Sequence, residues 1–211
     1  ACEEYSRSPE RPDQNESFSY WSNTRIELKN RKLSPKFADD AENFLLISES
    51  CASAIIAALS KYYDYHMDDL KFRSHSYLQI NYTPANLASE YIQDKHEDGH
   101  LLTLHNGNGK GLILYRAENR LDELESNHGS STIIPGSTIT LMTGGEIPPM
   151  YHEVKNPFDG RARISVMYFV NLDPTRRILP FVSNFYNENV DIATHVDKYP
   201  ENFGLPSLKK S

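Results

Sequence analysis

Two histidines and an aspartate in this sequence could together bind a metal ion. His96 and Asp98 lie two residues apart in the segment HEDGHLLTL, whose leucines favour a β-strand. Residues i and i+2 point to the same face of a strand, so the imidazole and the carboxylate can converge on one ion. A catalytic non-haem iron takes two histidines and one carboxylate and keeps open positions. His152, at the start of a later strand-like segment, is the candidate second histidine. We therefore expect His96, Asp98 and His152 to be the metal ligands and the catalytic residues.

An arginine and a serine could bind a carboxylate close to that metal. Arg163 and Ser165 share one face of the segment RARIS, eleven residues after His152. A guanidinium and a hydroxyl hold a carboxylate through charge-assisted hydrogen bonds. A buried arginine without an anionic partner is costly, and a bound dicarboxylate removes that cost. The alternate residues are apolar and are expected to pack outward against another layer: Ile164, Val166, Tyr168 and Val170.

A long amphipathic helix is predicted ahead of these motifs, between residues 33 and 66. Ser34 can cap its start, and Pro35 suits the first helical position. Apolar and small residues recur at helical spacing and predict one buried stripe. The members of this stripe are Phe44, Ser48, Cys51, Ile55, Leu59 and Tyr62. Cys51 is therefore expected to be a small core residue.

After about residue 70 the apolar period changes from that of a helix to two, which predicts strands. Residues 75–84 read as one strand that ends at Pro84. Residues 99–116 and 151–172 each predict two strands joined by a Gly/Asn or Pro/Gly turn, as in a hairpin. Residues 131–145 predict two short strands around Pro135-Gly136. Many short strands with such turns indicate a β-sandwich or jelly roll.

The chain length suits one domain. The predicted elements make this domain mainly β with flanking helices. We expect a single domain over residues 1–211, and its parts are an arm (1–32), a helix (33–66), a β core (70–173) and a C-terminal tail (174–211). Within the arm, residues 16–21 alternate aromatic and polar side chains. They are expected to dock as an edge strand or to line a pocket.

Composition argues against several classes of partner. The net charge is −7 and the basic residues are scattered, which argues against a nucleic-acid partner. No apolar run of the length of a membrane span is apparent, so no membrane partner is expected. Two cysteines make no disulfide framework, and a cytoplasmic location is the default. We expect a monomer that binds a small-molecule substrate.

The order and spacing of these motifs resemble the isopenicillin N synthase-like branch of the iron- and 2-oxoglutarate-dependent oxygenases. An HxD pair alone is a weak signal, but HxD, a distal histidine and RxS in this order are together specific. The resemblance covers roughly residues 16–173. Its segments are ESFSYW (16–21), INYTP (80–84), HEDGHLLTL (96–104), GKGLILY (109–115), IIPGSTITLMTGGEI (133–147), His152 and RARISVMYFVNLD (161–173).

This resemblance implies a double-stranded β-helix core, which is a cupin-like jelly roll. It implies Fe(II) held by His96, Asp98 and His152, with 2-oxoglutarate as cosubstrate and O₂ as oxidant. The distal carboxylate of 2-oxoglutarate would be bound by Arg163 and Ser165. Asn81 and Tyr82, both of the NYTP motif, are also expected to bind the cosubstrate. Three aromatic residues are candidate substrate contacts, namely Phe18, Tyr20 and Phe169.

The implied reaction couples oxidative decarboxylation of 2-oxoglutarate to hydroxylation, desaturation or cyclisation of a small specialised metabolite or amino-acid derivative, as in natural product biosynthesis. One alternative is a 2-oxoglutarate-independent oxidative cyclase like isopenicillin N synthase. In that case Arg163 and Ser165, the carboxylate clamp, would bind the substrate's own carboxylate. Another is a non-catalytic jelly-roll module that binds a small acid.

Several residue assignments also stay open. His100 shares the period-two face of His96 and is the one alternative metal ligand, while Glu97 should point away. Leu102 and Leu104 are expected to continue the inner wall. Phe18 and Tyr20 could instead anchor the arm to the barrel. The remaining histidines are expected to be structural: His66, His75, His105, His128 and His195.

Overall fold

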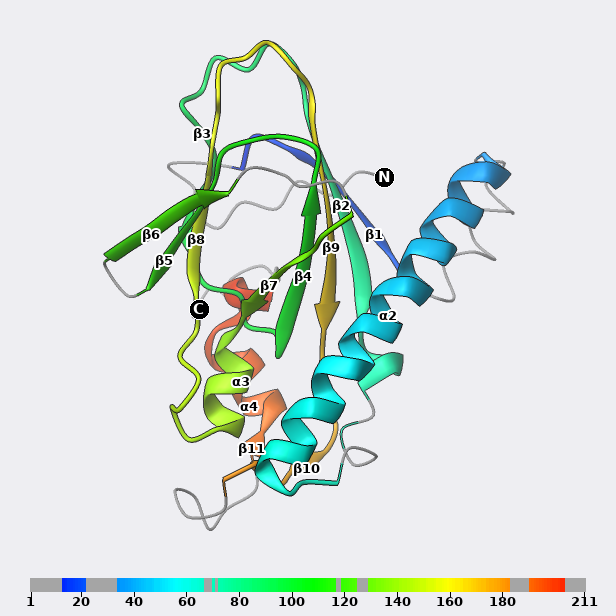
Figure 1. Ribbon diagram of the computed structural model, residues 1–211, viewed down its shortest axis with the longest axis vertical. Helices are drawn as coiled ribbons and strands as arrows, with labels where there is room; N and C mark the ends of the chain where they lie inside the picture. Colours follow the sequence, from blue (N-terminus) through cyan, green and yellow to red (C-terminus); the bar gives the residue numbers. More distant parts are fainter. Residues whose placement is uncertain are drawn as a thin grey trace, which may run out of the picture.

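The computed structural model describes residues 13–21, 34–66, 70, 72–116, 119–124, 129–182 and 190–203. Two antiparallel sheets face each other, and one long helix lies along the outside of the larger sheet (Figure 1). The larger sheet has the strand order β1-β2-β9-β4-β7, and the smaller sheet has the order β3-β8-β5-β6. The strands are β1 (Glu16–Tyr20), β2 (Tyr77–Thr83), β3 (Tyr91–His96), β4 (Leu102–Gly107), β5 (Leu112–Arg116), β6 (Asn119–Leu124), β7 (Thr132–Pro135), β8 (Tyr151–Lys155) and β9 (Arg163–Val170).

Successive strands cross from one sheet to the other, which is the winding of a jelly roll. From β2 to β9 the chain alternates between the larger and the smaller sheet, and only β6 stays beside its predecessor β5. The predicted hairpins over residues 99–116 and 151–172 are therefore wrong. Each contains two strands, but β4 and β5 belong to different sheets, and so do β8 and β9. Turn residues indicate where the chain reverses direction. Which strands pair is determined by the burial of their apolar faces.

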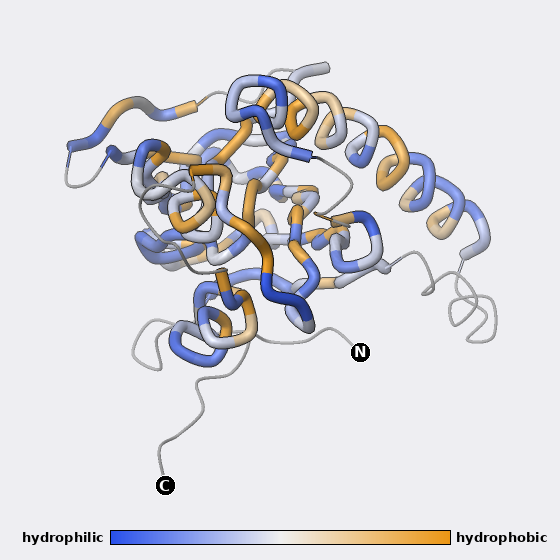
Figure 2. The backbone as a smooth tube through the Cα atoms, turned by 90° about the horizontal axis from the view of Figure 1, so that it is seen from below, coloured by the Kyte–Doolittle hydropathy of each residue, from blue (hydrophilic) through white to orange (hydrophobic). Residues whose placement is uncertain are grey.

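The main hydrophobic core lies between the larger sheet and helix α2 (Pro35–Tyr63). Apolar and polar residues alternate along this helix, which runs at the edge of the molecule (Figure 2). The sheet contributes alternate residues of its outer face, among them Leu78, Leu104, Tyr168 and Val170. The expected outward packing of the apolar face of β9 is confirmed for Tyr168 and Val170. Leu102 and Leu104 pack here too, so their expected place on the inner wall is wrong.

The face of α2 that packs on the sheet is displaced from the predicted stripe. The buried residues of the helix are Ala38, Ala41, Leu45, Ser48, Ala52, Ile56 and Ser60. Cys51 is exposed, so its assignment to the core is wrong. Helical spacing alone predicted a neighbouring face, because small residues such as Ala52 allow close packing and carry little hydrophobic signal.

Helix α2 also has the length and composition of a membrane-spanning helix, although the core helix of a soluble protein meets the same criterion. The expectation that no segment is apolar enough to span a membrane is therefore wrong on composition alone. In this structure the helix buries its inner face against a sheet. The absence of a membrane partner stays a prediction.

The inner faces of the two sheets meet in a second, smaller core. Ile134 of β7 packs there against residues of the smaller sheet, which are Ile92, Leu112, Leu114 and Val154. A third cluster on the inner face of the larger sheet contains Tyr77, Met167 and Phe169. Apolar side chains of both sheets therefore line part of the space between them.

The segment after β7 forms a helix where a second strand was predicted. Helix α3 (Ser137–Met142) begins after Gly136, and the backbone N–H groups of Ser137 and Thr138 donate to the carbonyl oxygens of Asp98 and Gly99. The last described elements are β10 (Arg177–Ile178), β11 (Val190–Asp191), α4 (Ile192–Lys198) and the 3₁₀ turn η3 (Pro200–Phe203). The tail therefore contains one short α-helix, α4, within the described residues. Of the predicted arm, residues 1–12 and 22–32 lie outside the described residues.

Strand β1 docks at the edge of the larger sheet and is held there by its aromatic residues. Tyr20 is completely buried, and its hydroxyl donates to Glu42 of α2 over 2.6 Å. The ring of Phe18 packs edge-on against Phe37 of the same helix. Both side chains contact α2, on the outer face of the sheet. Their expected role as substrate contacts is therefore wrong, and the alternative of an anchored arm fits the structure.

Candidate active site

Three metal-ligating side chains meet at the end of the smaller sheet. His96 of β3 and His152 of β8 are cross-strand partners, and Asp98 follows β3 by two residues. One ligand atom from each lies within 4.8 Å of the other two. Asp98 Oδ1 is 3.7 Å from His96 Nε2, and Asp98 Oδ2 is 3.9 Å from His152 Nε2. Two imidazole nitrogens and one carboxylate are the donor set of non-haem iron, so these residues fit an Fe(II) ion.

Each of the three ligands has a further contact with the chain that orients it. His96 Nδ1 lies 2.6 Å from the carbonyl oxygen of Asp94, and His152 Nδ1 lies 3.4 Å from that of Met150. These contacts favour a proton on Nδ1 and leave Nε2 as the ligand atom. Thr103 Oγ1 of β4 donates to Asp98 Oδ2 over 2.6 Å. Thr103 was not among the predicted site residues.

The loop that carries Asp98 is fixed from two sides. The backbone N–H of Ser137, at the start of α3, donates to the Asp98 carbonyl oxygen over 2.8 Å. A side chain at position 136 would clash with the backbone of this same loop. Glycine at this position therefore allows the start of α3 to lie close to the loop. On the other side, Asn202 of η3 donates to Glu97 Oε1 over 3.1 Å. Glu97 therefore points away from the metal ligands, as expected.

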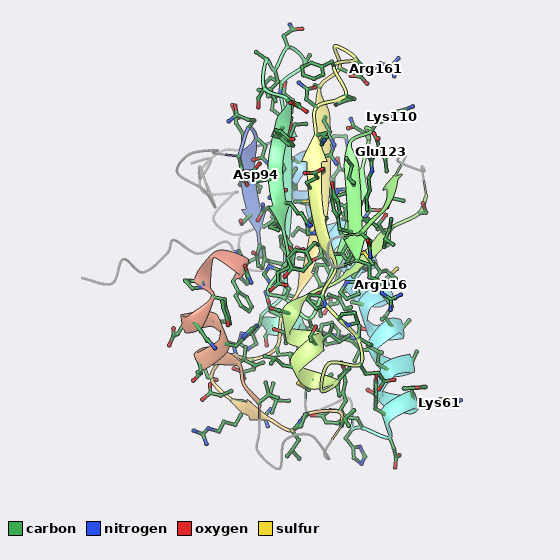
Figure 3. The ribbon with its side chains drawn as sticks, turned by 90° about the vertical axis from the view of Figure 1, so that its left-hand side faces the viewer. Lys61, Asp94, Lys110, Arg116, Glu123 and Arg161 are labelled. Atoms are coloured by element: carbon green, nitrogen blue, oxygen red, sulfur yellow. The ribbon has the colours of Figure 1, made fainter. Side chains whose placement is uncertain are left out.

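The carboxylate clamp lies on the inner face of the larger sheet. Arg163 and Ser165 of β9 are 6% and 2% exposed, and Arg163 Nη1 donates to Ser165 Oγ. Arg163 Nε donates to the backbone oxygen of Lys110, which lies with Arg161 at the end of the molecule opposite Lys61 (Figure 3). Arg163 Nη2 is buried and has no hydrogen-bond partner among the residues that the structure describes. Burial lowers the pKa of Arg163 to about 10, so the side chain stays charged at neutral pH. A buried cation with a free donor fits an anionic ligand.

Strand β2 places Asn81 on the clamp face and Tyr82 on the opposite face. Asn81 pairs with Ser165 across the sheet, whereas Tyr82 pairs with Ile164 and is 42% exposed. The expected contact of Tyr82 with the cosubstrate is therefore wrong, because neighbouring residues of a strand point to opposite faces. Thr83, which pairs with Arg163 and is buried, holds the inward position instead. Asn81 Oδ1 accepts from Ser17 and Gln79, which leaves its amide nitrogen as the group able to donate to a ligand.

His105 of β4 also reaches the clamp, although it was expected to be structural. Its Nε2 lies 3.3 Å from Ser165 Oγ. Burial lowers its pKa to about 3, and the positive charge of Arg163 is the next cause. The imidazole is therefore neutral at physiological pH. Once β4 is known to start at Leu102, Thr103 and His105 share its inner face, and this alternation is the sequence signal that could have identified both.

Phe169 and His100 lie together in an aromatic cluster rather than at the metal. Their ring centroids are 4.2 Å apart, and Tyr77 and Phe203 also contact His100. His100 Nδ1 lies 2.6 Å from Asn171 Oδ1. His100 is not part of the metal-ligating group found among the described residues. Phe169 does face inward from β9, as expected, and its role as a substrate contact stays a prediction.

Comparison with known proteins assigns this chain to a family. The model of the 2OG-Fe(II) oxygenase superfamily matches residues 59–172, which is more than half of the 211 residues. The chain therefore belongs to the 2OG-Fe(II) oxygenase superfamily. Among curated protein sequences, none matches it.

Solved structures of the same fold are distant in sequence. A full-length Neurospora crassa protein in complex with alpha-KG is 15% identical, with a TM-score of 0.69 over 88% of this chain and 65% of that one. JOX2 in complex with 2OG, Fe and JA is 15% identical, with a TM-score of 0.72 over 93% of this chain and 62% of that one. AtDAO1, the dioxygenase for auxin oxidation 1 from Arabidopsis thaliana, is 16% identical, with a TM-score of 0.71 over 82% and 68%. The chain thus spans about two thirds of the length of these proteins, and the likeness confirms the jelly-roll fold.

Proposed function

We propose that this protein is a non-haem iron oxygenase that couples oxidative decarboxylation of 2-oxoglutarate to the oxidation of a small organic substrate. The observation that carries the proposal is the buried guanidinium of Arg163, which lies between the same sheets as the metal-ligating triad. Its Nη2 has no partner among the described residues. A dicarboxylate that also offers a keto acid satisfies both groups. Membership in the isopenicillin N synthase-like branch is part of the proposal and is supported by the RxS motif after the distal histidine.

Strand β4 relates the two parts of the site in space. Thr103 bonds to Asp98 at the metal end, and His105, two residues further, contacts Ser165 at the clamp. The strand rise separates these two positions by about 6–7 Å. A five-carbon diacid can span such a gap, with its keto-acid end at the metal and its distal carboxylate at Arg163.

The chain's own residues bind and orient the reactants. His96, Asp98 and His152 would hold Fe(II) on one side and leave the remaining coordination positions to ligands. Arg163 and Ser165 would bind the distal carboxylate by charge-assisted hydrogen bonds. Bound Fe(II) supplies the activation of O₂ that decarboxylates 2-oxoglutarate and oxidises a C–H bond of the second substrate. The apolar clusters between the two sheets would help to exclude water from the reaction.

For the substrate we propose a small specialised metabolite or amino-acid derivative that is hydroxylated, desaturated or cyclised. The fold neighbours support a small molecule, since JOX2 was solved with JA and the Neurospora crassa protein with 5-formyluracil. Phe169 and its aromatic neighbours offer apolar contacts on the inner face of the larger sheet.

Anaerobic titration of Fe(II)-loaded protein with 2-oxoglutarate tests the proposal. We expect a visible charge-transfer band with 2-oxoglutarate and none with glutarate, which lacks the keto group. With O₂ and candidate substrates, succinate should form in proportion to oxidised product. Iron binding without any response to 2-oxoglutarate would overturn the proposal, and the clamp would then suit a substrate's own carboxylate, as in an oxidative cyclase.

A further inference from the structure

The clamp contains an imidazole that the proposed reaction does not by itself require. His105 Nε2 is 3.3 Å from Ser165 Oγ, and Ser165 Oγ already accepts from Arg163 Nη1. The three side chains come from two adjacent strands of the larger sheet, because β4 and β9 pair with Gly107 opposite Ser165. Arg163, Ser165 and His105 therefore form one connected group of polar atoms.

A glycine makes room for this arrangement. A Cβ atom at Gly107 would lie 3.1 Å from His105 Cε1 and 3.6 Å from Arg163 Nη2. The imidazole and the guanidinium thus approach each other over a residue without a side chain. This proximity brings the histidine close to Arg163 Nη2, the buried donor for which the described residues offer no partner.

The number of donor hydrogens and acceptor lone pairs in the group determines which hydrogen bond Ser165 can make to a ligand. A serine hydroxyl has one hydrogen and two acceptor lone pairs. Arg163 fills one lone pair. The neutral imidazole of His105 carries one N–H, and with the proton on Nε2 it fills the other. The only remaining capacity of Ser165 is then its own O–H, which must go to an acceptor such as a carboxylate oxygen.

We propose that His105 is a positioning residue of the clamp, whose imidazole donates to Ser165 and so directs the serine hydroxyl onto the distal carboxylate of the bound cosubstrate. The inference rests on the proposed function, since the distal carboxylate is that of 2-oxoglutarate. It goes beyond that function by assigning a third side chain to carboxylate binding. His105 acts through Ser165 and is not assigned contact with the reacting atoms.

The experiment measures the dissociation constants of two keto acids for Fe(II)-loaded protein from their charge-transfer bands. One is 2-oxoglutarate, and the other is pyruvate, which has no distal carboxylate. In His105→Leu we expect the constant for 2-oxoglutarate to rise about tenfold, the effect of losing one hydrogen bond near a charged group. The constant for pyruvate should not change. His105→Gln, which keeps an N–H near the Nε2 position, should recover most of the loss, and His66→Leu, at an exposed histidine, should match the wild type.

A double-mutant cycle tests whether His105 acts through Ser165. If it does, Ser165→Ala combined with His105→Leu binds 2-oxoglutarate no more weakly than Ser165→Ala alone. In steady-state kinetics, His105→Leu should raise the KM for 2-oxoglutarate and leave kcat unchanged.

Three results would overturn the inference: unchanged 2-oxoglutarate binding in His105→Leu, an equal loss for both keto acids, or additive effects in the cycle. If His105→Leu does not fold, His105→Gln decides alone, and a Gln variant that binds 2-oxoglutarate tenfold more weakly also overturns the inference. A wild-type protein that binds iron but gives no band with 2-oxoglutarate overturns the proposed function itself.

Discussion

The two sheets contribute different halves of the site, and the halves differ in how complete they are. The smaller sheet provides His96 and His152 from adjacent strands, with Asp98 just beyond β3, and further contacts with the chain orient these ligands. The larger sheet provides Arg163 and Ser165, and there the buried Arg163 Nη2 lacks a partner within the described part of the chain. One half therefore has the donor set of a metal site, whereas the other has a buried cation whose free donor fits an anionic ligand.

Removal of a metal ligand is expected to have the largest effect. In His152→Ala only two protein ligands remain, and Fe(II) affinity should fall by more than about 100-fold, because even the partners of metal ligands contribute 10–100-fold. Metal analysis after anaerobic loading and desalting measures the loss. His66→Ala, at an exposed histidine, is the control and should keep its iron. Full iron occupancy in His152→Ala would contradict the assignment of the smaller sheet.

The clamp should be separable from the metal half. Arg163→Met should weaken 2-oxoglutarate binding about 100-fold, since truncating one member of a buried charge pair costs about 2–5 kcal/mol. Iron binding should be unchanged. The control Arg161→Met alters an exposed arginine two residues away and should bind like the wild type. Anaerobic titration of the visible band measures both, and equal losses in the two variants would argue against a specific clamp.

The larger sheet depends on helix α2 for its outer core. Ile56 is completely buried in that core, so Ile56→Ala should lower the free energy of unfolding by about 2–5 kcal/mol. Ile47 lies on the same helix but is 64% exposed, and Ile47→Ala should change stability by less than about 0.5 kcal/mol. Denaturant unfolding of both variants checks the orientation of the helix. Similar losses in the two would mean that another face packs on the sheet.

Thr103 connects the halves, because it reaches from the larger sheet to Asp98. Thr103→Val removes the hydrogen bond at nearly constant volume and should weaken Fe(II) binding about tenfold. The matched control is Thr175→Val, because Thr175 donates to Asp173 over the same 2.6 Å outside the site. Competition with a metal-binding dye measures the affinities. An iron affinity that is unaffected in Thr103→Val would show that Asp98 needs no support from β4.

The smallest effect is expected at Tyr82, which points away from the clamp. Tyr82→Phe should change the dissociation constant for 2-oxoglutarate by less than about twofold, because its side chain is 42% exposed on the outer face. The anaerobic titration used for Arg163→Met measures it. A tenfold weakening would place the phenol at the cosubstrate and reverse the face assignment of β2.

Local alternation in the sequence predicts side-chain faces only within an unbroken strand. Arg163 and Ser165 lie inside β9, and their shared inward face was predicted correctly from the period of two. The stretch from 97 to 101 is a loop, and counting by two through it exchanged the inner and outer faces of β4. Leu102 and Leu104 were therefore predicted inward, while Thr103 and His105 hold those positions. Tyr82 was assigned to the cosubstrate because its motif resembles that of the family. Alternation along β2 from the inward-facing Asn81 would have predicted an outward-facing Tyr82.

The sequence by itself determined the chemical inventory of this protein, namely a histidine-aspartate pair, a distal histidine and an Arg-Ser pair in a fixed order, on strands of alternating residues. Those features are local and follow from residue type and spacing. Only the tertiary structure decided which strands pair, which face of α2 is buried, and that His105 joins Arg163 and Ser165. Strand partners are chosen by burial of apolar faces across the whole chain, and a contact between β4 and β9 exists only after the sheets have closed around it.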